Sequence, residues 1–253
     1  MSRDHAFFEK HVRERAETSA GPCDLPIAYE DASMLTAIWR VDGALARPLV
    51  PIQFEPWLVL GKALAMLCIF EYRRTSIGPY GEIGLGVLAR RKGSKPSLVR
   101  VLGDLRKEED QGLYVTNLPV TTEKARAAGV EIWGYPKYVA NIDTRFTPDG
   151  VHAELEGEFK LTMGRGRTLK TRGLPFVTYS VSGEGRLLRT VVEIDHDVRW
   201  GGASTVDLRV IGDGPTSTSI RALGIHGRAP TFAFRTDAMR SVLPRGKDMG
   251  PAA

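Results

Sequence analysis

Cysteine is scarce in this chain of 253 residues, which contains only Cys23 and Cys68. Neither belongs to a C-x-x-C pair or lies near a pair of histidines, so the sequence predicts neither a disulfide framework nor a zinc site. Cys68 lies within an apolar run, where a free cysteine is usually a small core residue. So little cysteine is typical of a protein kept in a reducing compartment, and we expect a cytoplasmic location.

Long hydrophobic runs are also missing. No stretch reaches the roughly 20 apolar residues that a transmembrane helix needs, and the charged residues 1–5 do not resemble a secretory signal. The net charge is +5 and the pI is near 9.3, but the basic residues are scattered and no nucleic-acid-binding motif occurs. We therefore expect neither a membrane nor a nucleic acid as a partner.

Several common active-site patterns are absent from the sequence. The five histidines show no metal-ligand spacing, and no G-x-S-x-G elbow of a serine hydrolase occurs. The glycines at 81, 84 and 86 do not form G-x-G-x-x-G, and no helix is predicted after them, which argues against a dinucleotide-binding loop. The sequence thus predicts a protein without a bound metal or cofactor.

The hydrophobic pattern is that of a strand-rich protein. About ten short strand candidates are separated by turn signals, with three or four short helices between them. This predicts a β-rich α+β fold, a barrel or sandwich, and not an alternating βαβ fold. We expect one domain over residues 1–253, with a helical or loop extension over 1–31 and a loose tail over 245–253. Helices are predicted over 4–18 and 121–129, and the last strand over 230–235.

What the sequence does contain is a lysine crowded by aromatic residues. Trp133, Tyr135 and Tyr138 surround Lys137, and Pro136 fixes the backbone just before it. A lysine held in an apolar pocket loses its proton more easily and becomes the nucleophilic amine of a Schiff-base enzyme. The same pattern also fits a lysine that packs its stem on aromatic rings and keeps its ammonium in water.

A carboxylate opens a predicted strand earlier in the chain. Gly78 and Pro79 predict a turn that delivers Glu82 onto a strand over residues 83–89. A carboxylate beside an apolar strand is either paired with a cation or takes part in proton transfer. The alternative is an ordinary surface glutamate at the end of a strand. Tyr80 lies two residues before it and offers a hydroxyl to a substrate.

Three patches together resemble the acetoacetate decarboxylase-like superfamily. They are Gly78–Glu82, Trp133–Lys137 and the turn Trp200–Gly202, which follow the order and rough spacing of that superfamily. The resemblance covers about residues 32–243. It implies an antiparallel, cone-like β-barrel with a few short helices, and assembly into homo-oligomers.

The resemblance also implies an active site. Lys137 would be the Schiff-base lysine and Glu82 the catalytic carboxylate beside it. A substrate would lie among the aromatic residues near these two, namely Tyr80, Trp133, Tyr135 and Tyr138. The expected activity is that of a lyase that forms a Schiff base with a small keto acid, in the first place decarboxylation of a β-keto acid of the acetoacetate type.

Two departures from the superfamily pattern keep other functions open. The decarboxylase has a second lysine directly after the reactive one, and this chain has Tyr138 there. The position of the superfamily's carboxylate-binding arginine falls near Ala32, so this chain lacks that arginine. Desolvation by aromatic neighbours would therefore have to activate Lys137 alone. An aldolase-dehydratase acting on pyruvate-like substrates and a non-catalytic barrel that binds a small ligand are the alternatives.

Overall fold

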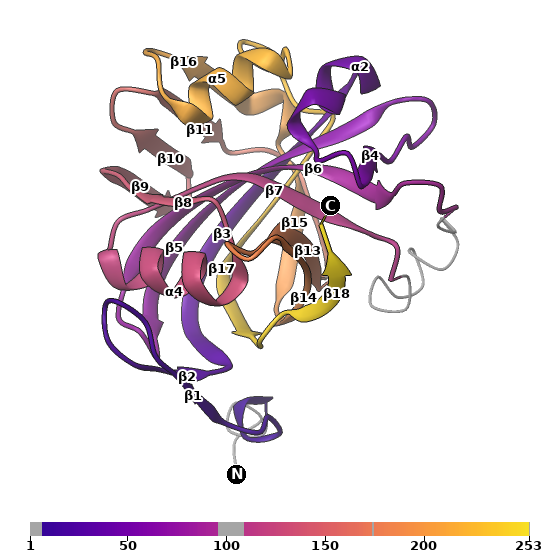
Figure 1. The fold of residues 1–253 in the computed structure, drawn as a ribbon. Coiled ribbons are helices and arrows are strands. Elements are labelled where there is room, and N and C mark those ends of the chain that lie inside the picture. Colours follow the sequence, from indigo (N-terminus) through magenta and orange to yellow (C-terminus); the bar gives the residue numbers. More distant parts are fainter. Residues whose placement is uncertain (1–6, 96–108, 174, 253) are drawn as a thin grey trace.

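A closed ring of strands forms the body of the protein (Figure 1). The computed structural model describes residues 7–95, 109–173 and 175–252. In these residues the largest sheet has twelve strands, and seven of them close into a barrel. The seven are β3 (Ile27–Val41), β5 (Ala63–Thr75), β6 (Tyr80–Arg91), β7 (Gln111–Val120), β13 (Phe176–Val181), β14 (Arg186–Asp195) and β17 (Phe232–Leu243). The ring closes because β14 pairs with both β13 and β17.

Shorter elements surround this barrel. The remaining strands of the largest sheet are β4 (Phe54–Pro56), β8 (Lys137–Val139), β12 (Thr168–Arg172), β15 (Asp197–Gly201) and β18 (Lys247–Pro251). A four-stranded sheet contains β9 (Ile142–Thr147), β10 (Gly150–Leu155), β11 (Phe159–Gly164) and β16 (Val206–Val210), and a two-stranded sheet contains β1 (Glu14–Ala16) and β2 (Cys23–Leu25). The helices are α2 (Gly43–Ala46), η1 (Arg47–Leu49), α4 (Glu123–Trp133), η3 (Ala203–Thr205) and α5 (Pro215–Ala222). None of the helices in the described residues is long and apolar enough to cross a membrane.

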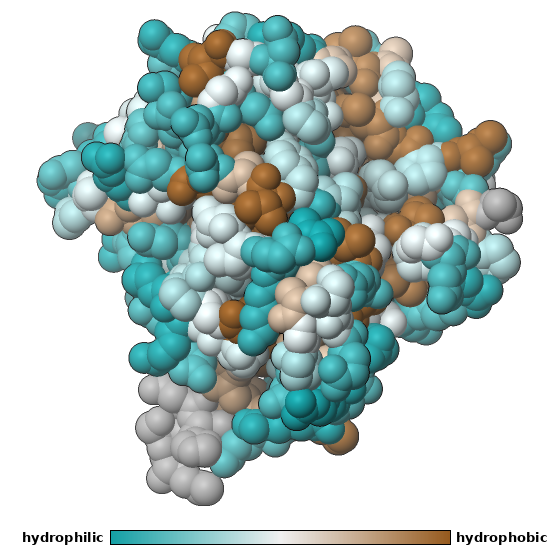
Figure 2. Space-filling model, turned by 60° about the vertical axis from the view of Figure 1, so that its left-hand side comes forward, coloured by the Kyte–Doolittle hydropathy of each residue, from teal (hydrophilic) through white to brown (hydrophobic). Residues whose placement is uncertain are grey.

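Strand β3 separates two apolar clusters because its successive side chains point to opposite faces. Leu35 and Trp39 pack in a cluster with residues of the four-stranded sheet, such as Leu161. Met34 and Ile38 belong to the second cluster, together with residues of β7 and α4. Burial on both faces explains why β3 is almost continuously apolar. Outside, the face in Figure 2 is largely hydrophilic, with apolar residues in separate patches.

The prediction of a β-rich barrel with a few short helices is confirmed. The barrel is mixed and not purely antiparallel, because β13 pairs in parallel with β7. Parallel neighbours need a long crossover connection. Here α4 and the strands β8 to β12 lie between β7 and β13 in the sequence, which supplies that length.

Three sequence-based boundaries were wrong. Residues 4–6 of the predicted helix over 4–18 lie outside the described residues, but Glu14–Ala16 is a strand that pairs with β2 and buries Ala16. The last predicted strand continues to Leu243. The tail expected to be loose forms β18, which pairs with β14. Main-chain hydrogen bonds order this polar segment, and its side-chain composition gives no sign of them.

Helix α4 is longer than predicted. Its start agrees with the sequence, since the Thr122 side chain caps the helix by accepting a hydrogen bond from the Ala125 amide. The expected end at Gly129 was wrong, because the helix runs on to Trp133 and ends at Gly134. Gly134 has a φ of 62°, the left-handed conformation that glycine adopts most easily. Gly129 is therefore an interior helix residue.

Candidate active site

The turn after α4 places Lys137 at the start of β8. Gly134 ends the helix, and the Lys137 amide donates a hydrogen bond to the Tyr135 carbonyl at 2.7 Å, which keeps the turn tight. β8 then pairs in parallel with β7, with Lys137 opposite Leu118. Lys137 therefore lies where a loop enters a strand.

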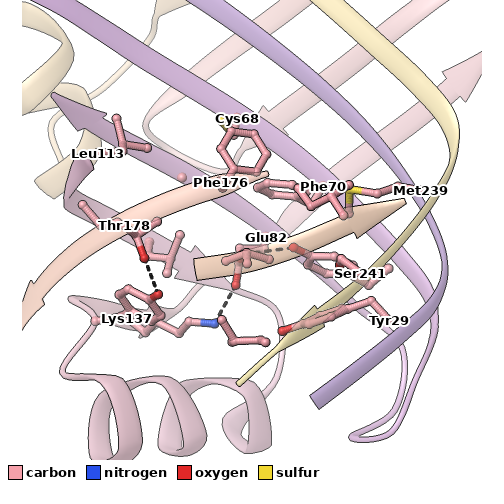
Figure 3. A pocket seen from close by; sticks show the side chains of 18 of the residues that line it. Tyr29, Cys68, Phe70, Glu82, Leu113, Lys137, Phe176, Thr178, Met239 and Ser241 are labelled. Carbon is pink, nitrogen blue, oxygen red and sulfur yellow. Dashed lines mark hydrogen bonds and ion pairs between the residues drawn. The ribbon is translucent and has the colours of Figure 1, made fainter. Parts of the chain in front are cut away.

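Lys137 and Glu82 form a buried ion pair. The Lys137 Nζ lies 2.6 Å from Glu82 Oε2, and only 5% of the lysine side chain and 9% of the glutamate side chain are exposed (Figure 3). Removing two charges from water costs several kcal/mol for each, which their attraction offsets only when the geometry is good. A short, direct contact between residues 55 apart in the sequence meets that condition.

Gly129 of α4 makes room for the stem of this lysine. A Cβ atom built on Gly129 would lie 2.3 Å from Cδ and 2.4 Å from Cε of Lys137. Glycine inside a helix destabilises it by about 0.5–1 kcal/mol relative to alanine. The helix carries this cost where the Lys137 side chain lies against it.

Three tyrosines surround the ion pair. The Tyr72 hydroxyl donates a hydrogen bond to Glu82 Oε1 at 3.4 Å, and the hydroxyls of Tyr29 and Tyr80 lie 3.1 Å apart. The Lys137 Nζ lies 5.6 Å from the centre of the Tyr80 ring, close enough for a cation–π contact. Burial raises the pKa of all three tyrosines, and the charge of Glu82 raises it further. They therefore stay protonated and act as hydrogen-bond donors.

The ion pair lies at one end of a cavity of about 90 Å³. Every strand of the seven-stranded ring contributes to the lining, so the cavity lies inside the barrel. Among the described residues, Lys137 and Glu82 are the only charged side chains in that lining. In Figure 3, Leu113 and Phe176 lie at the end away from Lys137. One water molecule needs about 10–15 Å³ of cavity volume. The cavity therefore has room for on the order of six to nine non-hydrogen atoms.

A sequence model of the acetoacetate decarboxylase family matches residues 13–175, more than half of the chain. The chain belongs to the acetoacetate decarboxylase family. It is therefore an enzyme of the lyase type, as predicted from the three patches.

Several solved structures share the fold of this chain. The acetoacetate decarboxylase from Legionella pneumophila subsp. pneumophila is 18% identical, with 98% of this chain and 95% of that chain covered and a TM-score of 0.65. The enduracididine biosynthesis enzyme MppR, complexed with pyruvate, is 15% identical, with coverages of 90% and 91% and a TM-score of 0.62. An acetoacetate decarboxylase-like enzyme from Sphingomonas wittichii RW1 is 15% identical, with coverages of 89% and 94% and a TM-score of 0.61. None of the curated proteins matches the chain.

Of the aromatic residues expected around Lys137, Tyr135 lines the cavity and Trp133 packs behind Tyr135. Tyr135 lines the cavity and shares a hydrogen bond of 2.7 Å with the Thr178 hydroxyl, and burial raises the pKa of Tyr135 to about 12. Trp133 stacks on the other side of Tyr135, with ring centres 6.4 Å apart, and its Nε1 donates to the Pro244 carbonyl at 2.8 Å. Trp133 does not line the cavity, and it supports Tyr135 from behind. The expectation that Trp133 lies beside the substrate is therefore corrected.

Tyr138 also lies away from the cavity. Its hydroxyl donates to Glu158 Oε1 at 2.8 Å and shares a second hydrogen bond, of 2.7 Å, with Thr216. Neighbouring residues of a strand point to opposite faces, so a strand that directs Lys137 into the barrel directs Tyr138 outward. The expected contact between Tyr138 and the substrate is therefore corrected. At the position of the decarboxylase's second lysine, this chain thus has a tyrosine that bonds to Glu158 and Thr216 and does not line the cavity.

Tyr138→Phe tests this placement. We expect kcat/KM to stay within about twofold of the original value, and the free energy of unfolding to fall by about 1–3 kcal/mol because Glu158 loses a buried hydrogen-bond donor. The Ser217 amide continues to donate to Glu158, which keeps the loss moderate. Steady-state kinetics and denaturant unfolding give the two values. A tenfold loss of kcat/KM at unchanged stability would place Tyr138 at the substrate after all.

Sequence reasoning missed several residues of the site. Tyr29 from β3, Tyr72 from β5 and Phe176 from β13 line the cavity without belonging to any local motif. One signal was present, since Cys68, Phe70 and Tyr72 are spaced two apart and so share one face of a strand. Cys68 is buried, as expected of a core residue, and burial raises the pKa of its thiol to about 12.

The described part of the chain contains no group of three or more His, Cys, Asp or Glu side chains that could hold a metal ion.

Proposed function

We propose that this family member decarboxylates a small β-keto acid through a Schiff base on Lys137. The observation that carries the proposal is the buried ion pair, with 2.6 Å between Lys137 Nζ and Glu82 Oε2, at one end of an otherwise uncharged lining. An amine in contact with a proton acceptor, inside an apolar cavity of keto-acid size, is the arrangement that Schiff-base formation requires.

Schiff-base formation begins with a proton transfer. The Lys137 ammonium passes a proton to Glu82, which gives a neutral amine and a carboxylic acid, and a neutral pair needs less solvation than two buried ions. The amine adds to the ketone carbon to form a carbinolamine, whose oxygen takes up the second amine proton. Glu82 then returns its proton to that hydroxyl, water leaves, and a protonated iminium remains.

Loss of carbon dioxide follows from the iminium. The bond between the carboxylate and the α-carbon breaks, its electron pair moves into the iminium, and a neutral enamine forms. Proton addition at the α-carbon and hydrolysis release the ketone and restore the Lys137 amine. The apolar lining favours this step, because it solvates the starting carboxylate poorly and carbon dioxide is uncharged.

The tyrosines have supporting roles in this scheme. Tyr72 donates to Glu82 Oε1 and so holds the carboxylate with its other oxygen toward Lys137. Tyr29 lines the cavity and, because burial keeps it protonated, has a hydroxyl that can donate to the substrate or to the carbinolamine. Such donors stabilise the oxygen on which negative charge develops during addition.

The lining also supports decarboxylation over the aldolase-dehydratase reaction. MppR was solved in complex with pyruvate, and an aldolase-dehydratase that acts on a pyruvate-like acid must hold the carboxylate throughout the cycle. The described lining offers no cation for that purpose besides Lys137, which the substrate carbonyl uses. A retained carboxylate would be buried without a partner, which is costly.

A single domain over residues 1–253, homo-oligomers and a cytoplasmic location stay predictions from the sequence.

Borohydride trapping tests the proposal. The protein is incubated with acetoacetate or with pyruvate, reduced with borohydride, and analysed by intact mass and peptide mapping. We expect an adduct on Lys137 with acetoacetate that has lost the carboxylate, together with release of carbon dioxide. An adduct only with pyruvate, with its carboxylate retained, would favour the aldolase-dehydratase. Tight binding without any adduct would favour the non-catalytic barrel.

A further inference from the structure

A second apolar cavity, of about 170 Å³, lies next to the catalytic one. Its lining comes from several strands and includes Met34, Ile38, Met66, Val198, Trp200 and Phe234. Arg172 is the only charged residue in the described lining, and 81% of its side chain is exposed, which marks the side where this cavity meets solvent. The cavity is larger than the catalytic one and has no part in the scheme above.

Two side chains separate the cavities. Leu113 of β7 and Phe176 of β13 line both of them. In Figure 3 these two residues lie across the catalytic cavity from Lys137. An alkyl arm that extends across the cavity from a ketone on Lys137 would therefore meet Leu113 and Phe176. Side chains change rotamer rapidly compared with turnover, so such a partition can open for a bound chain.

The sizes of the two cavities suit different parts of one molecule. The carboxylate, methylene and ketone of a 3-oxo acid fill most of the catalytic cavity, which has room for on the order of six to nine non-hydrogen atoms. A longer chain that extends from the ketone into the second cavity passes Leu113 and Phe176, which line both cavities. Beyond them the rings of Trp200 and Phe234, with centres 4.5 Å apart, and the side chain of Met66 offer apolar contacts only.

We propose that the second cavity binds an apolar tail of the substrate, so that the preferred substrates are 3-oxo acids with an alkyl chain and not acetoacetate itself. This inference rests on the proposed decarboxylation at Lys137. At about 10–15 Å³ for each water-sized group, the second cavity has room for on the order of eleven to seventeen non-hydrogen atoms, so a tail of about five or six carbons fits with space to spare.

A series of substrates tests the tail site in the unmodified protein. Initial rates of carbon dioxide release are measured with acetoacetate, 3-oxohexanoate and 3-oxooctanoate, and corrected for spontaneous decarboxylation. Each buried methylene contributes about a fourfold factor in kcat/KM, so 3-oxooctanoate should exceed acetoacetate by at least about fiftyfold. A kcat/KM that stays level or falls with chain length overturns the inference.

Met66→Trp adds a test of location, since Met66 lines the second cavity and not the catalytic one. The indole should fill the space for the tail and lower the ratio of kcat/KM for 3-oxooctanoate to that for acetoacetate at least about tenfold. Met66→Leu, which nearly conserves volume, should keep the original ratio. An equal loss for both acids would mean that this cavity is only an entry path, and would overturn the tail site. If Met66→Trp does not fold, the substrate series decides.

The trapping experiment separates this inference from the function on which it rests. An adduct on Lys137 with acetoacetate, combined with no gain for the longer acids, overturns the tail site and leaves the Schiff-base lyase standing. The absence of an adduct with all three acids overturns both. An adduct with 3-oxooctanoate at concentrations where acetoacetate gives little supports both.

Discussion

Lys137→Arg is expected to lower kcat at least about a thousandfold and to abolish the borohydride-trapped adduct. Arginine keeps its proton at any pH that a protein tolerates, so it cannot form a Schiff base. It still places a positive charge beside Glu82, which avoids leaving a buried carboxylate without a partner. Carbon dioxide release and intact mass after reduction give the two readouts, and the melting temperature shows whether the fold is retained.

A surface lysine provides the matched control for this substitution. Lys160 Nζ also contacts a carboxylate, Glu154, at 3.0 Å, but 49% of its side chain is exposed. Lys160→Arg should leave the rate and the adduct unchanged, because an exposed ion pair contributes little. The proposed mechanism is wrong if the Lys137→Arg protein still turns over β-keto acids at a rate close to that of the unmodified protein.

Gly129→Ala is expected to lower kcat at least about a hundredfold, since a displacement of the nucleophile by about 1 Å costs a factor of that size. The new methyl group would overlap Cδ and Cε of Lys137, and the flexible lysine has to move away from Glu82. Alanine stabilises a helix interior by about 0.5–1 kcal/mol relative to glycine. Separating a buried ion pair costs about 3–5 kcal/mol. The melting temperature should therefore fall, against the usual effect of this substitution.

Steady-state kinetics and thermal unfolding measure both effects. Gly183→Ala is a suitable control, because a Cβ at this exposed glycine meets nothing within 4 Å. We expect it to change neither the rate nor the melting temperature by much. If Gly129→Ala raised the melting temperature and kept the activity, Lys137 would have another route to Glu82, and the contact with α4 would not matter for catalysis.

Gly129 also shows what could and could not be predicted from the sequence of this protein. A glycine after a run of helix-forming residues predicts the end of a helix, and the helix was expected to end there. Its actual function depends on Lys137, which is eight positions away and folds back onto the helix from β8. Local sequence rules treat glycine as a conformational signal and contain no information about which side chain will later need its space.

The fold class and the central pair were accessible to prediction for different reasons. Short alternating stretches with turn signals between them are enough to predict a β-rich barrel. Lys137 and Glu82 were identified because each belongs to a patch that resembles the acetoacetate decarboxylase-like superfamily. Their contact depends on the pairing of β7 with both β6 and β8, which no single stretch of sequence determines.

The rest of the site depends on strand register in the same way. Tyr29 and Tyr72 reach the ion pair because β3 and β5 are neighbours in the ring, with two irregularities in their pairing between Tyr29 and Ala32. A shift by one residue would turn each side chain to the other face. Tyr138 is the exception, since simple alternation from Lys137 predicts that it points away from the cavity.

Strand β8 lies outside the closed ring and, among the described strands, pairs only with β7. Glu82 and the apolar walls belong to the ring, whereas Lys137 and Tyr135 come from one continuous segment that runs from α4 to β8. The walls of the cavity and the reactive Lys137 are thus encoded by separate stretches of the gene. Mutations in residues 123–139 can redirect or remove the amine while the ring keeps its hydrogen bonds, and mutations in the ring can reshape the chamber around an unchanged amine. A lineage with this arrangement can change its substrate and its reaction in separate evolutionary steps.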